Sequence, residues 1–264
     1  MHLDLEDRVV VITGAGRGIG RAVAEAFLRE RSVVVGLDAG EGALAWFDQA
    51  RTDLGLRGAS FPCDVRDASR VTAVVEEIVR TFGRVDVVVN NAGVLVEGFV
   101  EDLTDDAWER CFDVNVAGTF RMCRAVIPTM KAQRSGRIIN AASFAAIVPS
   151  VGSAAYAASK AAVVQFTRTL AGELGPWNVT VNSYAPGMVP TGLNGFAEMP
   201  QDVQDQLLDT LSLRRWGEPG EVADLICFLA SDAAGYITGT LLDVSGGKLA
   251  TQLPRRAYER QARS

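Results

Sequence analysis

Apolar runs recur along the chain, and segments with helical periodicity lie between them. Six runs have the length and composition of strands: residues 9–13, 33–38, 85–93, 136–143, 178–187 and 239–247. Between the first three, residues 21–30 and 71–82 space their apolar side chains near the helical period. The Val and Ile runs lack polar alternation, which is typical of strands buried on both faces. The pattern predicts an α/β fold, a doubly wound parallel sheet with helices on both faces.

One domain is predicted over residues 1–247, because no Pro/Gly/Ser-rich linker or composition break interrupts the alternation. Residues 188–215 depart from it, mixing Gly and Pro with a short amphipathic stretch. A long excursion after the carboxyl end of a strand is a common position for a lid or substrate loop. Residues 248–264 form a C-terminal tail carrying four arginines. This tail is either a solvated end or a cover over a neighbouring subunit.

Composition narrows the class of protein. Hydrophobic residues make up 48% of the 264, yet no stretch approaches the roughly 18 consecutive apolar residues of a membrane span. Asp4, Glu6 and Asp7 lie where a signal peptide would have its basic and apolar regions, so a cytoplasmic protein without membrane attachment is expected. The net charge of -6 argues against a nucleic-acid partner.

Cysteine and histidine usage excludes two further chemistries. The four cysteines, Cys63, Cys111, Cys123 and Cys227, form no C-x-x-C pair, and reduced, mostly buried thiols are expected. The one histidine is His2, so neither a His-based metal site nor a Ser-His-Asp triad can be assembled, and no metal is expected.

A glycine-rich turn follows the first strand directly. Residues 13–20 read TGAGRGIG, with Gly14, Gly18 and Gly20 able to form a tight turn close to a pyrophosphate at a helix N-terminus. Asp38 ends the second strand, 24 residues after Gly14, where an acid accepts hydrogen bonds from ribose hydroxyls and repels a 2′-phosphate. This predicts a Rossmann-type site that prefers NAD to NADP, although Arg17 could bind a phosphate.

The stretch SAAYAASK at 153–160 places Tyr156 and Lys160 one helical turn apart. Residues at i and i+4 are neighbours on a helix face. Taken alone, the pair is more simply explained as a cation beside an aromatic ring.

TGAGRGIG, NNAG at 90–93 and YAASK at 156–160 together resemble the short-chain dehydrogenase/reductase (SDR) family, in its compact single-domain subclass, from Leu5 to Gly247. The resemblance implies, with the glycine turn and Asp38, a cofactor site. Its residues are Gly14, Arg17, Gly18, Ile19, Gly20, Asp38, Asp64, Val65, Asn91, Ala92, Gly93, Tyr156, Lys160, Pro186, Gly187, Val189 and Thr191.

The resemblance also implies a catalytic set of Asn115, Ser143, Tyr156 and Lys160. Tyr156 would be the acid/base, with its pKa lowered from about 10 by the Lys160 ammonium and an oxidised nicotinamide. Ser143 would hydrogen-bond the substrate oxygen, and Asn115 would hold a water in a proton relay. The alternatives are a strand-end loop residue for Ser143 and a helix-kink or capping amide for Asn115.

The expected function is therefore an oxidoreductase that moves a hydride between a nicotinamide cofactor, NAD preferred, and a small-molecule secondary alcohol or ketone. Two alternatives stay open: a 3-oxoacyl-thioester (ACP-type) reductase using NADPH, and a catalytically silent dinucleotide-binding regulator. The resemblance also implies a homotetramer, with a homodimer as the alternative. The sequence leaves the substrate undetermined, because 188–215 offers both apolar and amide side chains.

Overall fold

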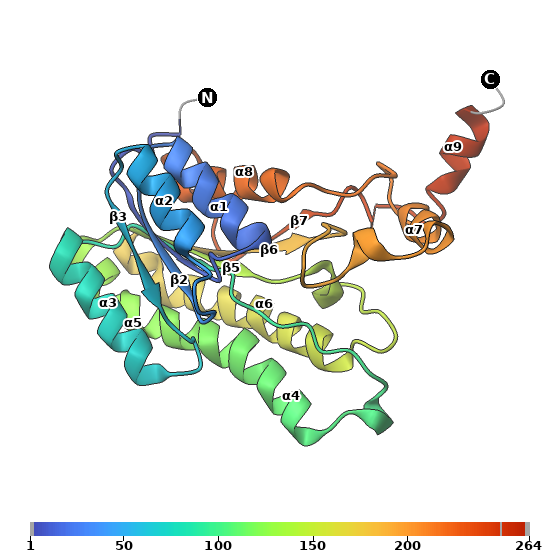
Figure 1. Ribbon diagram of the computed structural model, residues 1–264, viewed down its shortest axis with the longest axis horizontal. Coiled ribbons are helices and arrows are strands. Elements are labelled where there is room, and N and C mark those ends of the chain that lie inside the picture. Colours follow the sequence, from blue (N-terminus) through green and yellow to red (C-terminus); the bar gives the residue numbers. More distant parts are fainter. Residues whose placement is uncertain (1–2, 249, 262–264) are drawn as a thin grey trace.

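A seven-stranded parallel sheet runs through the middle of the molecule (Figure 1). The computed structural model describes residues 3–248 and 250–261. The strands are β1 (Val9–Thr13), β2 (Val33–Asp38), β3 (Gly58–Pro62), β4 (Val87–Asn90), β5 (Gly136–Ala141), β6 (Val179–Pro186) and β7 (Leu241–Val244). Across the sheet their order is β3-β2-β1-β4-β5-β6-β7. This arrangement confirms the predicted doubly wound fold.

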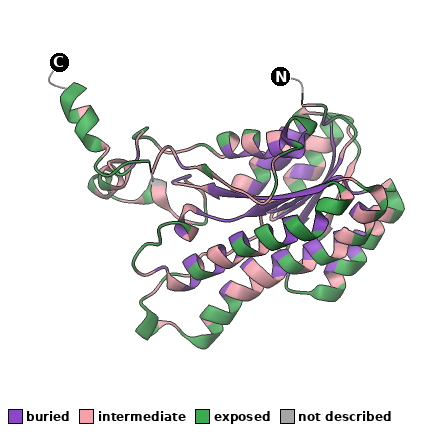
Figure 2. Cartoon of the chain, turned by 180° about the vertical axis from the view of Figure 1, so that it is seen from behind, coloured by how far each residue is buried: buried purple, intermediate pink, exposed green. Residues whose placement is uncertain are grey.

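Helices cover both faces of the sheet. They are α1 (Gly18–Arg29), α2 (Ala45–Asp53), α3 (Ala68–Phe82), α4 (Asp105–Phe112), α5 (Thr119–Gln133), α6 (Ala154–Leu174), α7 (Gln201–Leu208), α8 (Pro219–Ala230) and α9 (Arg255–Gln261). On one face Ile12 packs in a cluster with Phe27 of α1 and Ile226 of α8. On the other, Val11 belongs to a cluster with Leu170 of α6. Figure 2 shows the buried strands between helices whose outer faces are exposed.

The direction of strand addition reverses at β1, which pairs with β2 on one side and with β4 on the other. In an open α/β sheet, the connections that follow two such strands run to opposite faces of the sheet and leave a crevice for a ligand at the carboxyl ends of the strands. Thr13 at the end of β1 is in register with Asn90 at the end of β4. The glycine turn and the NNAG segment therefore begin side by side.

The predicted elements differ from the structure at the edge strand β3, in the length of the central strand β4, and in the segments outside the sheet. The edge strand β3 has the sequence GASFP and only intermediate burial, so it lacks the long apolar run of the other strands. The strand predicted at 85–93 is shorter, because β4 covers only Val87–Asn90. The segment 188–215 contains α7 and a 3-10 turn, Phe196–Glu198, and the tail contains α9, which projects beside α7 (Figure 1).

Two expectations about composition can be set against the fold. All four cysteines are free and buried, as expected. Within residues 3–248 and 250–261, no helix is long and apolar enough to cross a membrane. The single histidine, His2, and the tail arginine Arg263 lie outside the described residues.

One ion-pair cluster joins strands at the end of the sheet remote from the crevice. Asp232 accepts hydrogen bonds from the guanidinium of Arg8, at 2.9 Å, and from that of the buried Arg137 on β5, at 3.0 Å. We expect Asp232→Asn to lower the free energy of unfolding by about 1 kcal/mol, because the buried Arg137 loses one of its two nearby negative charges, Asp86 being the other, while the 67% exposure of the Asp232 side chain keeps the loss small. Urea denaturation measures this loss. The control is Glu25→Gln, which breaks an exposed pair with Arg21 and should cost less than about 0.5 kcal/mol; equal losses would contradict the prediction.

Candidate active site

The glycine turn brings the start of α1 against the end of β1. Gly14 has a φ of 66°, in the left-handed region that favours glycine. A Cβ placed on Gly20 would lie 2.0 Å from the Gly14 carbonyl oxygen and 2.5 Å from Asn91 Nδ2. No side chain fits there, so the helix N-terminus and its unpaired N–H groups can reach the crevice. This is the arrangement that binds a phosphate.

Asn91 of the NNAG segment ties β4 to this turn. Its Nδ2 donates to the carbonyl oxygens of Thr13, at 3.1 Å, and Gly14, at 3.2 Å. Its Oδ1 accepts a hydrogen bond from the hydroxyl of Tyr184, at 3.1 Å. Tyr184 lies on β6 and is fully buried. The phenol thus orients the amide that supports the glycine turn. Sequence reasoning missed this role, because Tyr184 stands within an apolar strand pattern.

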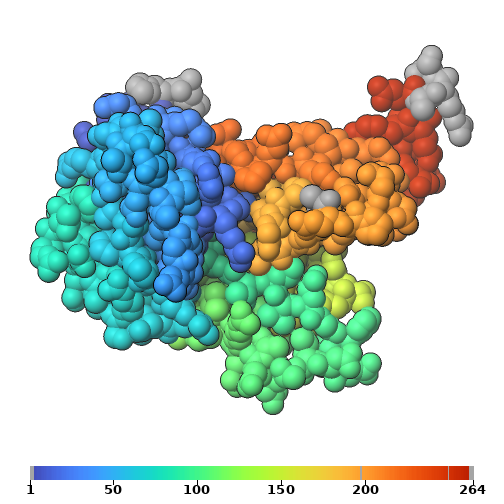
Figure 3. Space-filling model, in the orientation of Figure 1, coloured from blue at the N-terminus to red at the C-terminus, as the bar shows by residue number. Residues whose placement is uncertain are grey.

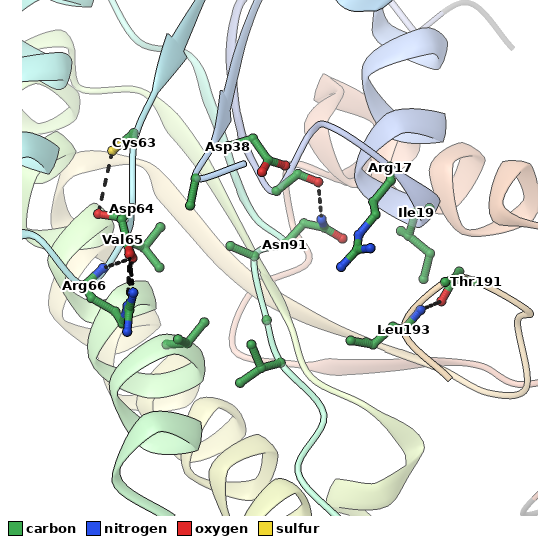
Figure 4. Close-up of a pocket in the computed structure, with 18 of the residues that line it drawn as sticks. Arg17, Ile19, Asp38, Cys63, Asp64, Val65, Arg66, Asn91, Thr191 and Leu193 are labelled. Atoms are coloured by element: carbon green, nitrogen blue, oxygen red, sulfur yellow. Dashed lines mark hydrogen bonds and ion pairs between the residues drawn. The ribbon is translucent and has the colours of Figure 1, made fainter. Parts of the chain in front are cut away.

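A cavity of about 370 Å³ opens at the crevice, where the N-terminal segment, the 188–215 loop and the NNAG segment meet (Figures 3 and 4). Eleven of the predicted cofactor residues line it: Gly14, Arg17, Gly18, Ile19, Asp38, Asp64, Val65, Asn91, Ala92, Gly93 and Thr191. Sequence reasoning missed eight others: Ala39, Cys63, Arg66, Val94, Arg110, Val114, Gly192 and Leu193. Of these, Arg66 could have been predicted from the sequence, because it stands two residues after Asp64.

Asp38 stands at the end of β2 beside the glycine turn. Its two carboxylate oxygens accept hydrogen bonds from the backbone N–H groups of Gly16 and Gly40, each at 2.9 Å. A carboxylate has about four acceptor positions, so two stay free for hydroxyl donors. Arg17 extends instead toward the 188–215 loop: a Cβ on Gly192 would be 3.9 Å from its Nη1 (Figure 4).

The chemistry of the cavity fits a dinucleotide. The start of α1 and Arg17 suit a pyrophosphate, and Asp38 suits a ribose. Farther along, the Arg66 guanidinium forms a bidentate pair with Asp64 and lowers the pKa of that carboxyl. The pair leaves no isolated negative charge at that end of the cavity.

Six predicted cofactor residues do not line this cavity. Gly20 lies beneath it, against Gly14. Val189 lines a neighbouring cavity that also includes Ser245 and Gly246. A Cβ on Gly187 would lie 2.6 Å from the Cα of Ser245, so this glycine permits the chain to pass the C-terminal strand. The other three are Pro186, Tyr156 and Lys160.

Helix α6 carries Tyr156 and Lys160 on one face, as predicted. The Lys160 Nζ is buried, 5.7 Å from the centroid of the Tyr156 ring, and donates to the carbonyl oxygen of Ala141 at 2.8 Å. A Cβ on Gly93 would lie 3.4 Å from that Nζ. Since Gly93 lines the cofactor cavity, the ammonium reaches its inner wall.

The pKa of Lys160 is lowered to about 8, because burial removes water from the ammonium. The pKa of Tyr156 is raised, chiefly by burial, and a hydrogen bond with Ser143 opposes the rise. The prediction was that Lys160 and an oxidised nicotinamide together lower the pKa of this phenol; in the chain alone, that pKa is raised. Desolvation of the phenolate outweighs the favourable groups around it.

Ser143 and Asn115 come from separate segments and meet α6. Ser143 follows β5 and caps the 3-10 turn Phe144–Ala146, where its hydroxyl accepts from the Ala145 N–H at 3.1 Å. Asn115 lies in a π-helical turn, Asp113–Gly118, between α4 and α5. Such turns are frequent at functional sites.

The Asn115 amide is held on both sides. Its Oδ1 accepts from Val94 N–H at 2.9 Å, and its Nδ2 donates to Val94 O and to the Ser159 hydroxyl, both at 3.0 Å. Asn115 therefore lies in a distorted, π-helical turn and also has its side-chain amide fixed by hydrogen bonds. A Cβ on Gly93 would lie 3.2 Å from Oδ1, so Asn115 and Lys160 flank the same wall of the cavity.

A dinucleotide-binding crevice with a tyrosine, a lysine and a serine at its inner end defines a nicotinamide-dependent oxidoreductase. A family model described as "Enoyl-(Acyl carrier protein) reductase" matches residues 14–248. The chain belongs to the short-chain dehydrogenase/reductase family.

Two groups of known proteins are similar to the chain. The 3-oxoacyl-[acyl-carrier-protein] reductase FabG of Thermotoga maritima is 36% identical over 243 residues, covering 92% of this chain and 98% of the relative. The enzyme of that name from Escherichia coli is 36% identical over 246 residues, covering 93% and 98%. A solved NAD+-bound xylitol dehydrogenase superposes with a TM-score of 0.88 at 31% identity, covering 92% of this chain and 100% of that one.

The Tyr184 hydroxyl should matter for cofactor binding more than for turnover. We expect Tyr184→Phe to raise the KM for the cofactor about threefold to tenfold, because Asn91 loses the bond that orients it toward the glycine turn. The kcat should change less than about twofold. Steady-state kinetics with varied cofactor measures both.

A matched control is Ser32→Ala. Ser32 is buried at the opposite end of the sheet, and its hydroxyl donates to the Leu5 carbonyl oxygen at 2.7 Å. This variant should lose similar stability and keep the cofactor KM. Equal changes of KM in the two variants would show that Tyr184 acts only through stability.

Proposed function

We propose that the chain reduces the ketone of a 3-oxoacyl group carried as a thioester to the 3-hydroxyacyl group. The observation that supports a carbonyl reductase is that Tyr156, Ser143 and Lys160 lie together beside the cofactor cavity. The substrate class is supported by 36% identity to 3-oxoacyl-[acyl-carrier-protein] reductases over nearly the whole chain. The names of these relatives favour the 3-oxoacyl-thioester reductase, which the sequence analysis gave as an alternative to an NAD-preferring alcohol dehydrogenase.

Each catalytic side chain has a role in the proposed reaction. The reduced nicotinamide supplies the hydride to the carbonyl carbon when it is bound. Tyr156, whose pKa is raised by burial, gives its proton to the carbonyl oxygen. Ser143 donates a hydrogen bond to that oxygen and stabilises its developing charge. Lys160 would hold the cofactor ribose and pass a proton from solvent to Tyr156, through a water held at Asn115.

A second candidate is an NAD-preferring dehydrogenase of a free secondary alcohol. Two features favour it: the acid Asp38 at the ribose position and the likeness to a solved NAD+-bound xylitol dehydrogenase. The preference for NAD is a separate proposal that holds for either substrate. Asp38 supports it, as does the direction of Arg17, which extends toward the 188–215 loop.

The silent regulator has less support, because all four catalytic positions hold residues that can do the chemistry. We propose a homotetramer, located in the cytoplasm. Exposed apolar side chains at Ile147, Val148 and Val151, just before α6, support an interface near that helix. The edge strand β7 also pairs on only one side among the described residues.

A spectrophotometric screen at the nicotinamide absorbance tests the function. Substrates are 3-oxoacyl thioesters, cyclic ketones and polyols, each with NAD(H) and NADP(H). The proposal expects 3-oxoacyl thioesters to have the highest kcat/KM. Higher values for polyols would favour the second candidate, and cofactor binding without any turnover would favour the regulator.

Tyr156→Phe should lower kcat by about 10²- to 10⁴-fold and leave the dissociation constant of the cofactor nearly unchanged, because only the transferable proton is removed. Steady-state turnover and fluorescence titration of the reduced cofactor measure the two quantities. Tyr236→Phe is the control, since Tyr236 is fully exposed and should behave as the wild type. Substantial turnover by Tyr156→Phe would refute the assignment.

Asp38→Asn should lower the ratio of kcat/KM for NAD to that for NADP by about tenfold, because it removes the charge that repels a 2′-phosphate. Kinetics with both cofactors and one substrate gives the ratio. Glu41→Gln removes an equal charge from an exposed position three residues away and should leave the ratio unchanged. A wild type with equal efficiency for both cofactors would overturn the NAD preference.

A further inference from the structure

Lys248 places an ammonium group between the catalytic serine loop and the 188–215 loop. Its Nζ lies 5.0 Å from the centroid of the Phe144 ring, and Phe144 directly follows Ser143. The same Nζ donates a hydrogen bond to the Thr210 hydroxyl at 2.9 Å. The cation therefore bridges the turn that follows Ser143 and the 188–215 loop.

This ammonium has no carboxylate partner among residues 3–248 and 250–261. Two other cations of the 188–215 loop do have one: Arg214 pairs with Asp209 at 2.9 Å, and Arg215 forms an ion pair with Glu221. Burial lowers the pKa of Lys248, and no opposing charge compensates for the lost water. A partly desolvated cation of this kind gains more from a bound anion than an exposed one does.

The backbone holds this position firmly. The Ser245 hydroxyl accepts a hydrogen bond from the Lys248 N–H at 3.2 Å. The Ser212 hydroxyl donates to the Gly247 carbonyl oxygen at 3.0 Å, and the Leu213 N–H donates to Gly246 O at 3.0 Å. The ammonium thus extends from a chain segment that is tied to the base of the 188–215 loop.

We propose that Lys248 is a specificity-determining residue that binds an anionic group of the substrate. This inference rests on the proposed function, because it adds a substrate feature to the same site. A carboxylate of a free oxo acid and the phosphate of a phosphopantetheine thioester share this chemistry. Phe144 beside the ammonium provides an apolar surface for the acyl or pantetheine chain that connects the anion to the carbonyl.

Two matched substrate pairs separate the sources of the anion. The first is 3-oxobutanoate and its methyl ester, and the second is the 3-oxobutanoyl thioesters of 4′-phosphopantetheine and of pantetheine. For wild type and Lys248→Met, the measured quantity is the kcat/KM of each anionic member divided by that of its neutral partner. In at least one pair, Lys248→Met should lower this ratio about ten- to a hundredfold and leave the neutral member unchanged.

Two further variants show whether the charge acts at its position. Lys248→Arg keeps the charge and should retain most of the ratio. Arg256→Met removes an equal charge from the exposed tail helix and should leave both ratios unchanged. Unchanged ratios in Lys248→Met for both pairs would overturn the proposal, and so would an equal loss for the charged and neutral members.

A binding measurement keeps this outcome distinct from failure of the proposed function. If the wild type reduces none of the four compounds, the proposed function fails. The anion site is then tested by melting temperature. Each compound is added to the wild type and to Lys248→Met, both loaded with the reduced nicotinamide cofactor, and the shift in melting temperature is measured. A larger shift by an anionic member, lost in Lys248→Met, supports the anion site, and equal shifts in both proteins overturn it.

Discussion

The close approach of α1 to the end of β1 is the constraint on which the cofactor side of the molecule depends. Gly20 lies so near the Gly14 carbonyl oxygen that even a methyl group would overlap it. Only this spacing lets the N–H groups of the first turn of α1 face the crevice at the reversal point of the sheet. The Asn91 amide fills the remaining space and links the turn to β4, and the Tyr184 phenol fixes that amide from β6. Hydrogen bonds thus connect β1, β4 and β6 at the glycine turn.

Burial is the main cause of the pKa shift of both Tyr156 and Lys160. Lys160 is surrounded by protein, bonds a carbonyl oxygen, and has its pKa lowered to about 8. Tyr156 beside it has its pKa raised. Both shifts favour the neutral forms, so charges brought by cofactor and substrate change the protonation of this pair more than they would in water. Burial likewise lowers the pKa of Lys248, which lies beside Phe144.

The predicted strands β1 and β2 and the missed strand β3 show what an apolar pattern can and cannot indicate. β1 and β2 match the predicted strands residue for residue, because strands buried on both faces must be apolar throughout. β3 was missed, since an edge strand with one Gly and one Pro carries no such pattern. Sequence reasoning placed Tyr156 and Lys160 on one helix face, because that follows from the helical period alone. It predicted a lowered pKa for Tyr156, whereas burial raises this pKa in the structure. The burial comes from neighbours that are distant in the chain, so the sequence pattern could not indicate it.

The sequence by itself predicted the class of fold, the glycine turn beside a cofactor crevice, and Tyr156 and Lys160 on one helix face, since strand patterns, glycine spacing and the Tyr–Lys interval are local properties. Only the tertiary structure decided which side chains meet across the sheet: the Tyr184 hydroxyl with Asn91, Arg66 with the cofactor cavity, and the Lys248 ammonium with Phe144. It also decided where Gly187 and Val189 lie, beside the C-terminal strand and outside the cofactor cavity. These contacts join segments up to about a hundred residues apart, and their distances depend on how helices pack on the sheet, which no local pattern encodes.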